Sequence, residues 1–316
     1  MMNSLSRRNF FRRTAAGAMA MGAASWLDLP SALAAAPARN TGPLAWTGPI
    51  GLELYTVRHQ MARNPLATLR MVAKTGYKLV ESDPYPRSSP GHPALPTATL
   101  MRYLHETGLQ IISGLTMQPR PGTRAQWLRR IQAAKRMGLR YLGTMETNVL
   151  DAAHWKALAH QYNTVAGPLC RDHGMQLFYH NHITEFIPTG GTNGYAILQQ
   201  ETEPHHLAFE MDVFWMTYAK QDPVAWFKRA PGRYPLLHVK DMKKHVPPAY
   251  NPEKFPQGFQ PFTEVGRGRI DWARVFAHIH EGGVKHIYVE QDRTDIPVRQ
   301  AIRISYQYLR HLRLRG

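Results

Sequence analysis

Cysteine is almost absent from this chain of 316 residues, whose one thiol is Cys170. A single cysteine cannot form an internal disulfide, so we exclude a disulfide-stabilised scaffold and expect no cysteine-based catalysis. The chain also lacks low-complexity segments and a long apolar run. Its most apolar segment near the N-terminus covers about 14 residues, whereas a membrane-spanning helix needs about 20. These absences predict no stable membrane insertion.

Acidic residues are scarce relative to basic ones. There are 22 Asp and Glu against 39 Lys and Arg, which gives a net charge of +17. Such a balance is typical of proteins that bind nucleic acid or membrane surfaces. Here the positive residues are scattered, for example Arg120, Arg129 and Arg140, and do not alternate with aromatic residues in one segment. We therefore predict no nucleic-acid partner.

The N-terminus has the three-part layout of an export signal. "SRRNFF" is followed by the weakly apolar "TAAGAMAMGAASWL" and the small-residue run "SALAAAPA". The adjacent Arg7 and Arg8 indicate the twin-arginine type; a membrane anchor is the alternative. We predict that residues 1–36 are signal peptide and linker, that cleavage follows Ala34 or Ala36, and that the twin-arginine translocase exports the folded protein to the periplasm.

A repeated pattern predicts the fold. Five segments combine the end of a helix, a glycine and an apolar strand, and their glycines are Gly76, Gly108, Gly138, Gly174 and Gly283. Glycine adopts the left-handed conformation that ends a helix, and the apolar run that follows is typical of a strand buried on both faces. "IGLELYTVR", "HLAFEMDVFW" and "PLLHVKDM" supply three further strands. Eight strand–helix units predict that residues 45–316 form a single (β/α)8 TIM barrel of the α/β class.

The main alternative is an open, doubly wound α/β sheet. That fold normally carries a glycine-rich phosphate-binding turn after its first strand, and no such turn follows Tyr55. Helix-start signals agree with the barrel. Asn64-Pro65 and Asp271-Trp272 each pair a capping residue with the first residue of a predicted helix.

Polar side chains end four consecutive predicted strands. Active sites of TIM barrels lie at the carboxyl ends of the strands, and alternate residues of a strand point to the same side. The pairs that share a side are His180 with His182, Glu210 with Asp212, His238 with Lys240, and Tyr288 with Glu290. Unpaired charges buried in a barrel cost several kcal/mol each. A divalent cation held by imidazole and carboxylate groups compensates them, so the pattern predicts a metal site.

Six motifs give the chain a resemblance to a known family. In order they are "GLELYTVR", "YHNHITEF", "MDVFW", "HVKDM", "EVGRGRID" and "YVEQDRT". From Ile50 onward the chain resembles the xylose-isomerase-like sugar phosphate isomerase/epimerase family, in the branch marked by "YHNHxxEF". The resemblance implies one divalent metal, Mn²⁺ in the first place, with Zn²⁺, Co²⁺ and Mg²⁺ as alternatives. The ligands that it implies are His180, Asp212, His238 and Glu290.

The chain departs from the commoner family pattern in two places. His180 stands where glutamate is more usual, which argues against a mechanism that needs two metal-bound glutamates. The third and fourth strands carry "SGLTM" and "GTMET" where close relatives often have a histidine and a polar-aromatic pair. Glu146 is therefore an alternative fourth ligand.

The remaining candidates surround this predicted metal. The catalytic candidates are Glu185 as general base, His182, Glu290, and Lys240 as a donor to a substrate oxygen; the substrate-binding candidates are Trp215, Asn181 and Arg267. For several of these a structural role is the alternative: a loop ion pair for Glu185, neutralisation of Glu210 or Asp241 by Lys240, and core packing for Trp215. The Pro-rich segment 242–262 is predicted to be a lid or a wall of the substrate site.

The predicted metal and its neighbours suit removal of a proton next to a carbonyl, which forms an enediolate. We expect a small-molecule carbohydrate substrate, with isomerisation or epimerisation first. The family resemblance implies an alternative, a lyase or hydratase that cleaves 3-keto-glycosides by elimination. The expected export and the absence of a phosphate cradle favour a sugar without phosphate. An abasic-site endonuclease and a non-catalytic sugar-binding protein are further alternatives.

Overall fold

A computed structural model describes residues 42–82, 95–117, 122–148, 150–246 and 261–315. Residues 40–316 group into one compact unit. The predicted leader and most of the predicted lid lie outside the described residues, so the structure leaves both as predictions. No helix in the described ranges combines the length and the apolar character that crossing a membrane requires.

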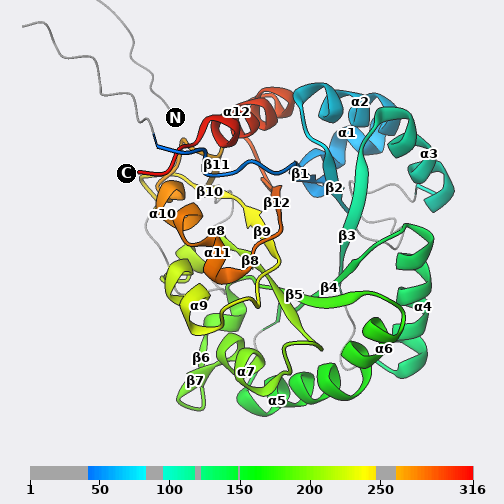
Figure 1. Cartoon of the computed structure of the whole chain (residues 1–316), viewed down its shortest axis with the longest axis vertical. Coiled ribbons are helices and arrows are strands. Elements are labelled where there is room, and N and C mark those ends of the chain that lie inside the picture. Colours follow the sequence, from blue (N-terminus) through cyan, green and yellow to red (C-terminus); the bar gives the residue numbers. More distant parts are fainter. Residues whose placement is uncertain (1–41, 83–94, 118–121, 149, 247–260, 316) are drawn as a thin grey trace, which may run out of the picture. The chain divides into compact units, whose positions relative to one another are not determined.

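Eight parallel strands close into a barrel, in the order β1-β12-β9-β8-β5-β4-β3-β2. Their bounds are β1 Ile50–Glu53, β2 Leu79–Glu81, β3 Gln110–Met117, β4 Tyr141–Met145, β5 Gln176–His180, β8 Ala208–Asp212, β9 Leu236–Val239 and β12 His286–Val289. Figure 1 shows the strands at the centre with the helices outside them. All eight predicted strands are present, and the predicted TIM barrel is confirmed.

Helices connect the strands around the outside of the barrel. Their bounds are α1 Arg58–Arg63, α2 Pro65–Thr75, α3 Thr97–Thr107, α4 Arg124–Arg136, α5 Ala152–Gln161, α6 Gly167–Asp172, α7 Gly194–Glu201, α8 Val213–Tyr218, α9 Pro223–Arg229, α10 Trp272–Ala277, α11 Ile279–Gly282 and α12 Val298–His311. Short helical turns η1 Leu54–Val57, η2 Tyr162–Ala166 and η3 Thr184–Phe186 lie between them, as do the strand pairs β6 Pro188–Thr189 with β7 Thr192–Asn193 and β10 Asp241–Met242 with β11 Phe262–Thr263.

The local signals in the sequence act as predicted. Asn64 caps α2 by accepting a hydrogen bond from the amide of Ala67, with Pro65 as the first helical residue, and Asp271 caps α10 in the same way. Gly108 and Gly283 end α3 and α11 in the left-handed conformation, with φ of 68° and 75°. A side chain is strained at such φ values, which is why glycine marks the ends of these helices.

The barrel has two apolar layers. The larger lies between the strands and the helices and contains most of the buried aromatic side chains. The smaller fills the lower part of the barrel interior with Leu79, Ile112, Phe178, Ala208, Leu236 and Tyr288. Gly143 lets Phe178 fit there, because a Cβ at Gly143 would lie 2.3 Å from the ring. These apolar side chains fill one end of the barrel interior, so the polar groups lie at the other end, where the strands have their carboxyl ends.

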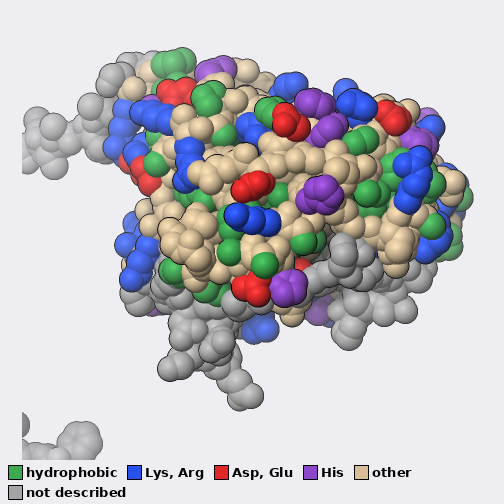
Figure 2. Space-filling view, turned by 90° about the horizontal axis from the view of Figure 1, so that it is seen from below, with side chains coloured by type: hydrophobic (Ala, Val, Ile, Leu, Met, Phe, Trp, Pro, Cys, Tyr) green, Lys and Arg blue, Asp and Glu red, His purple; other side chains and the backbone are tan. Residues whose placement is uncertain are grey.

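The visible face in Figure 2 carries Lys and Arg side chains at several separate places, interspersed with acidic, histidine and apolar side chains. This matches the scatter of the basic residues along the sequence.

Candidate active site

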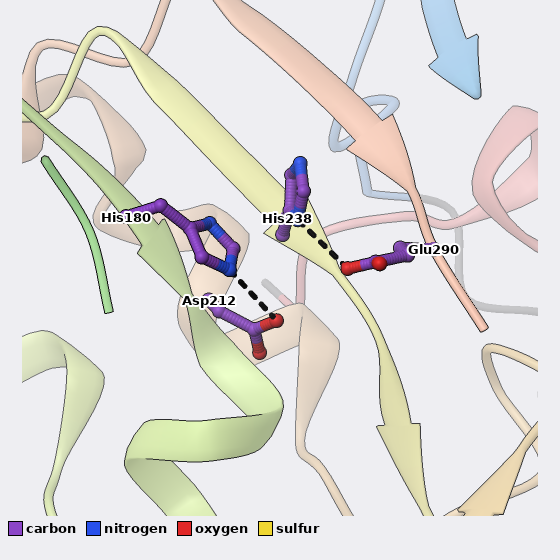
Figure 3. Close-up of side chains that lie close together, drawn as sticks. All are labelled: His180, Asp212, His238 and Glu290. Atoms are coloured by element: carbon purple, nitrogen blue, oxygen red, sulfur yellow. Dashed lines mark hydrogen bonds and ion pairs between the residues drawn. The ribbon is translucent and has the colours of Figure 1, made fainter. Parts of the chain in front are cut away.

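The four predicted metal ligands lie together at the carboxyl ends of four adjacent strands. His180 is the last residue of β5 and Asp212 the last of β8, whereas His238 lies within β9 and Glu290 directly follows β12. Figure 3 shows the four side chains pointing toward one another. Each offers a ligand atom within 4.8 Å of the others, and all four are buried.

Specific atoms of these side chains face one another. His180 Nε2 lies 3.9 Å from Asp212 Oδ2, and His238 Nδ1 lies 3.0 Å from Glu290 Oε2 (Figure 3). The other oxygen of Asp212, Oδ1, accepts the amide hydrogen of Trp215 and so caps α8. Because the cap fixes one carboxylate oxygen, the other is held toward His180.

The Lys240 side chain lies beside two of the four candidate ligands, Asp212 and Glu290. Its ammonium lies 3.1 Å from Asp212 Oδ2, 2.7 Å from Glu290 Oε2 and 3.1 Å from Asp292 Oδ2. Burial alone would lower its pKa, but Asp212, Asp292 and Glu290 raise the pKa of Lys240 well above its ordinary value. Lys240 is therefore a fixed positive charge paired with two candidate ligands, and not with Glu210 or Asp241 as the structural alternative held.

A second layer of carboxylates lies against the two histidines. Glu210 Oε2 is 3.1 Å from His180 Nδ1 and 3.3 Å from His238 Nε2. Glu81 Oε2 is 2.6 Å from His238 Nε2, and its other oxygen accepts from Ser113. Glu53, Glu81 and His238 form a further group of ligand-type atoms within 4.8 Å.

Glu53, Glu81 and Asp292 were not among the sequence-based candidates. Glu53 and Glu81 are the last residues of β1 and β2, and Asp292 stands two residues after Glu290. The alternation rule that identified the later strands would have found them. In the sequence Glu53 and Glu81 each end an apolar run, and Asp292 alternates with Glu290.

Burial and mutual repulsion shift the charges in this layer. Burial, followed by repulsion from Glu81, raises the pKa of both Glu53 and Glu210 well above the ordinary value. Burial would lower the pKa of His238, but Glu210 and Glu290 raise it well above 6.5. Without a cation, Glu53, Glu210 and His238 therefore tend to be protonated, because the cluster has more carboxylates than positively charged side chains.

The two imidazoles of the metal group differ in charge. Burial and the nearby His238 and His182 lower the pKa of His180 well below its ordinary value, so its 3.9 Å contact with Asp212 is not an ion pair. Burial raises the pKa of Asp212 to about 6, an increase that Lys240 limits. His180 is therefore neutral, the form in which imidazole binds a metal.

His182 and Trp215 lie beside this group. The His182 ring packs edge-on against His180 at 4.9 Å and lies 5.7 Å from Trp215, and the Lys240 ammonium lies 5.6 Å from the Trp215 ring. Burial, together with Lys240, lowers the pKa of His182 to about 3. His182 Nδ1 has no hydrogen-bond partner among the described residues. Both side chains therefore border the candidate metal group.

Glu185 lies outside the cluster, and the geometry does not support its predicted role as general base. Its carboxylate accepts hydrogen bonds from the Tyr179 hydroxyl (2.8 Å), the amide of His182 (3.0 Å) and the Thr184 hydroxyl (3.1 Å). Tyr179 alternates with the inward-facing His180 and packs against Trp155 outside the strands. Glu185 therefore fixes the loop after β5.

Three other candidates also lie apart from the metal group. Asn181 is fully buried and uses its side-chain amide to bond both the amide and the carbonyl of Asp212, so it joins the ends of β5 and β8. Arg267 is exposed and lies 3.7 Å from Glu264. The Oε1 atom of Glu146 accepts three hydrogen bonds from Thr147 and Asn148. Glu146 is thus not among the clustered ligand atoms.

The "EVGRGRID" segment is organised around Asp241. The Asp241 carboxylate accepts hydrogen bonds from the amides of Gly266, Gly268 and Ile270 and from the Trp272 indole. These backbone donors surround an internal carboxylate, in the way that a phosphate-binding loop surrounds an external anion. The glycines therefore shape the loop between β11 and α10 and do not form a phosphate site.

Comparison with known proteins agrees with this architecture. The family profile described as "Xylose isomerase-like TIM barrel" matches residues 69–312. The chain belongs to this family. The clustered strand-end residues that we describe are thus the candidate site of a xylose isomerase-like TIM barrel.

Curated relatives of this xylose isomerase-like chain include proteins named inosose dehydratase. The one from Clostridium botulinum (strain Eklund 17B / Type B) is 27% identical over 245 residues, which cover 70% of this chain and 80% of that protein. Another, from Clostridium perfringens (strain ATCC 13124), is 28% identical over 163 residues, 48% of this chain and 54% of that protein.

Solved structures share the fold at lower identity. A sugar phosphate isomerase/epimerase from Parabacteroides distasonis is 21% identical with a TM-score of 0.70, over 87% of this chain and 98% of that one. The IolI protein, whose structure is described as having a bound zinc atom, is 15% identical with a TM-score of 0.58, over 82% of this chain and 96% of that one. At these identities the likeness establishes the fold.

Proposed function

We propose that this chain is a metal-dependent enzyme that removes a proton next to the carbonyl of a sugar or keto-sugar. The observation that carries the proposal is the convergence of His180, Asp212, His238 and Glu290 on one point, with the Lys240 ammonium beside them. Curated relatives named inosose dehydratase support carbohydrate chemistry at this site.

The residues present fit a divalent cation. Two imidazole nitrogens and two carboxylates form a donor set that suits Mn²⁺, Zn²⁺ and Co²⁺. Among the described residues Asp212 Oδ2 has no hydrogen-bond partner and lies beside the Lys240 ammonium and His180 Nε2, as expected of a ligand atom. The family resemblance favours Mn²⁺, and the zinc atom in the IolI structure favours Zn²⁺. A bound cation polarises a substrate carbonyl and so acidifies the neighbouring C–H.

The side chains around the cation divide the remaining work. Glu290 stays ionised because Lys240 and His238 hold its pKa well below the ordinary value despite burial, and it is the ionised carboxylate that we assign as the proton acceptor. The Lys240 ammonium can donate a hydrogen bond to the oxygen on which negative charge develops. The neutral His182 can bond a hydroxyl group through Nδ1, and Trp215 offers a flat apolar surface to a sugar ring.

Elimination is the second candidate reaction. Epimerisation requires a base on each face of the substrate carbon, and His180 replaces one of the two carboxylates that commonly fill these roles. Elimination requires one base and one acid: the base takes the proton, the C–O bond to the β-substituent breaks, and the acid protonates the departing oxygen. The names of the curated relatives also denote loss of water.

Metal analysis and deuterium exchange test the proposal. The purified protein should contain about one divalent cation per chain. With the metal bound it should transfer solvent deuterium into one of a panel of ketoses, inososes and 3-keto-glycosides, or eliminate from it. Asp212→Asn should lose metal and activity while α8 remains capped, since asparagine caps helices as well as aspartate does.

The contrary results are also specific. Ligand binding without deuterium transfer would indicate a sugar-binding protein, and metal-dependent cleavage of abasic DNA would indicate a nuclease. Full metal occupancy in Asp212→Asn would remove that residue from the ligand set.

We further propose that the twin-arginine leader directs the protein to the periplasm. The paired arginines and the small-residue run support this location. The translocase that acts on folded proteins would then be a transient partner, and the cation would be bound before export.

A further inference from the structure

We propose that Glu210 and Glu81 position the two histidine ligands, each by accepting a hydrogen bond from the ring nitrogen that does not face the metal. The inference rests on the proposed function, because it concerns the same cation. It assigns the coordinating atoms as Nε2 of His180 and Nδ1 of His238, and it gives a role to two buried carboxylates that the proposed reaction does not use.

The ring contacts divide into two sets with opposite orientations. His180 directs Nδ1 at Glu210 (3.1 Å) and Nε2 at Asp212 (3.9 Å). His238 directs Nε2 at Glu81 (2.6 Å) and Nδ1 at Glu290 (3.0 Å). In each ring one nitrogen therefore faces a candidate ligand, and the other faces a carboxylate of the deeper layer.

An imidazole that binds a cation is neutral, with one N–H donor and one lone pair, so His238 would release its second proton when the cation binds. A carboxylate acceptor at one nitrogen holds the proton there and leaves the lone pair on the other nitrogen for a metal. Glu210 thus selects the Nδ1–H form of His180, and Glu81 selects the Nε2–H form of His238. The two histidines coordinate through different nitrogens because they approach the same point from β5 and β9 with their rings turned oppositely.

Glu81 is anchored independently of the histidines, whereas Glu210 is placed by its position between the two rings. Glu81 and Glu210 are fully buried. The second oxygen of Glu81 accepts from the buried Ser113 hydroxyl, which fixes the side chain from the neighbouring strand β3. Glu210 Oε2 lies between the two rings, 3.1 Å from His180 and 3.3 Å from His238, and so ties their orientations together.

Glu53 provides a matched control. It ends β1 in the same layer and lies near Glu81 and His238, but the hydrogen bond of its carboxylate is with the amide of Tyr55 and not with an imidazole. Glu53→Gln removes a carboxylate of the same size from the same layer without removing a bond to a histidine. It therefore separates the loss of a carboxyl group from this layer from the loss of a hydrogen bond to a histidine.

The first experiment measures metal affinity. The intact chain and its Glu81→Gln, Glu210→Gln and Glu53→Gln variants are stripped of metal, checked for folding by circular dichroism, and titrated with Zn²⁺ and Mn²⁺ against a competing chelator. We expect Glu81→Gln and Glu210→Gln to bind about 10- to 100-fold more weakly, and Glu53→Gln to lose much less. Equal losses in all three variants, or none in the first two, would overturn the positioning role.

The second experiment reads the ring nitrogens directly. Two-bond ¹H–¹⁵N correlations of the zinc-loaded, ¹⁵N-histidine-labelled chain should show His180 protonated at Nδ1 and His238 protonated at Nε2. The reverse pattern in either ring, or two cations bound per chain with Glu81 as a ligand, contradicts the inference while leaving the proposed reaction intact. A wild-type chain that binds no divalent cation contradicts both.

Discussion

At the scale of single residues, the same side-chain type takes different roles according to the contacts around it. Glu290, Glu210 and Glu185 are all buried, yet Lys240 keeps the first ionised, the second contacts two imidazoles, and the third secures a loop. Residue type alone identified Glu185 as a base because it follows two histidines. Its three hydrogen bonds, to Tyr179, His182 and Thr184, hold it in the loop after β5, and residue type alone does not indicate these bonds.

The pH dependence of stability should report the burial of Glu185. Burial raises its pKa from 4.5 to about 7, so the folded chain holds a proton that the unfolded chain has released between these values. Stability from this group is therefore complete below about pH 4.5 and is lost as the pH rises to 7. At about 1.4 kcal/mol per pKa unit, the loss reaches about 3 kcal/mol.

Urea unfolding of the wild type and Glu185→Gln at pH 5 and pH 8 measures this effect. Because glutamine does not titrate, the variant should gain about 2–3 kcal/mol relative to the wild type between the two pH values. A difference between the two proteins that stays constant with pH would show that Glu185 is not the titrating group.

At the scale of elements, the carboxyl ends of all eight barrel strands lie at the same rim. The loops that follow the strands shape this rim, and their shape depends on the hydrogen bonds that anchor them. Asn181 ties the ends of β5 and β8 together, and Asp241 gathers the loop before α10. In the sequence Asn181 directly follows the candidate ligand His180, and Asp241 directly follows Lys240. The loops therefore hold the site by hydrogen bonds to the backbone and not through ligands of their own.

Gly268→Ala should destabilise the loop around Asp241. A Cβ at this position would lie 2.0 Å from Asp241 Oδ1 and 2.5 Å from the carbonyl oxygen of Met242. The carboxylate has little room to move, because it accepts hydrogen bonds from the loop amides. We expect a loss of about 1–3 kcal/mol in the free energy of unfolding, measured by urea or thermal unfolding.

Arg267→Ala is the control for that substitution, since Arg267 is an exposed residue of the same loop. It should change stability by less than about 0.5 kcal/mol. If both variants were equally stable, the loop would not depend on its close approach to Asp241.

At the scale of the whole molecule, charge is divided between inside and outside. Nine described acidic side chains are buried, out of 22 Asp and Glu in the chain, whereas Arg130, Arg233 and Lys240 are the buried Lys and Arg side chains in the described ranges. In the described part of the chain, burial therefore removes more acidic than basic side chains from the surface. This division of charge is one reason for an excess of basic residues that is otherwise typical of nucleic-acid-binding proteins.

Export should depend on the first arginine pair. Replacing Arg7 and Arg8 by lysine should retain the protein in the cytoplasmic fraction, because the translocase reads the paired arginines. The same change at Arg12 and Arg13, in the same leader, should leave export intact. Fractionation and immunoblotting measure both, and a wild-type chain confined to the cytoplasm would contradict the proposal.

The sequence by itself determined the barrel and much of its site. Glycines at helix ends, such as Gly108 and Gly283, and capping pairs, such as Asn64-Pro65, act within a few residues of chain, so the sequence displays them directly. Strand alternation has the same local character, and it places His180 and Asp212 at one rim once eight strands are counted.

Only the tertiary structure decided which of the strand-end groups meet and which atoms they present. Glu81 contacts His238 across 157 positions of sequence, and nothing local to either residue indicates that contact. Likewise Glu185 and Asn181 are within five residues of His180 in the sequence, but their side chains form hydrogen bonds with Tyr179 and with the backbone of Asp212. The physical reason is that barrel closure brings together strands far apart in the chain, and burial then makes each polar atom take the partner that closure provides.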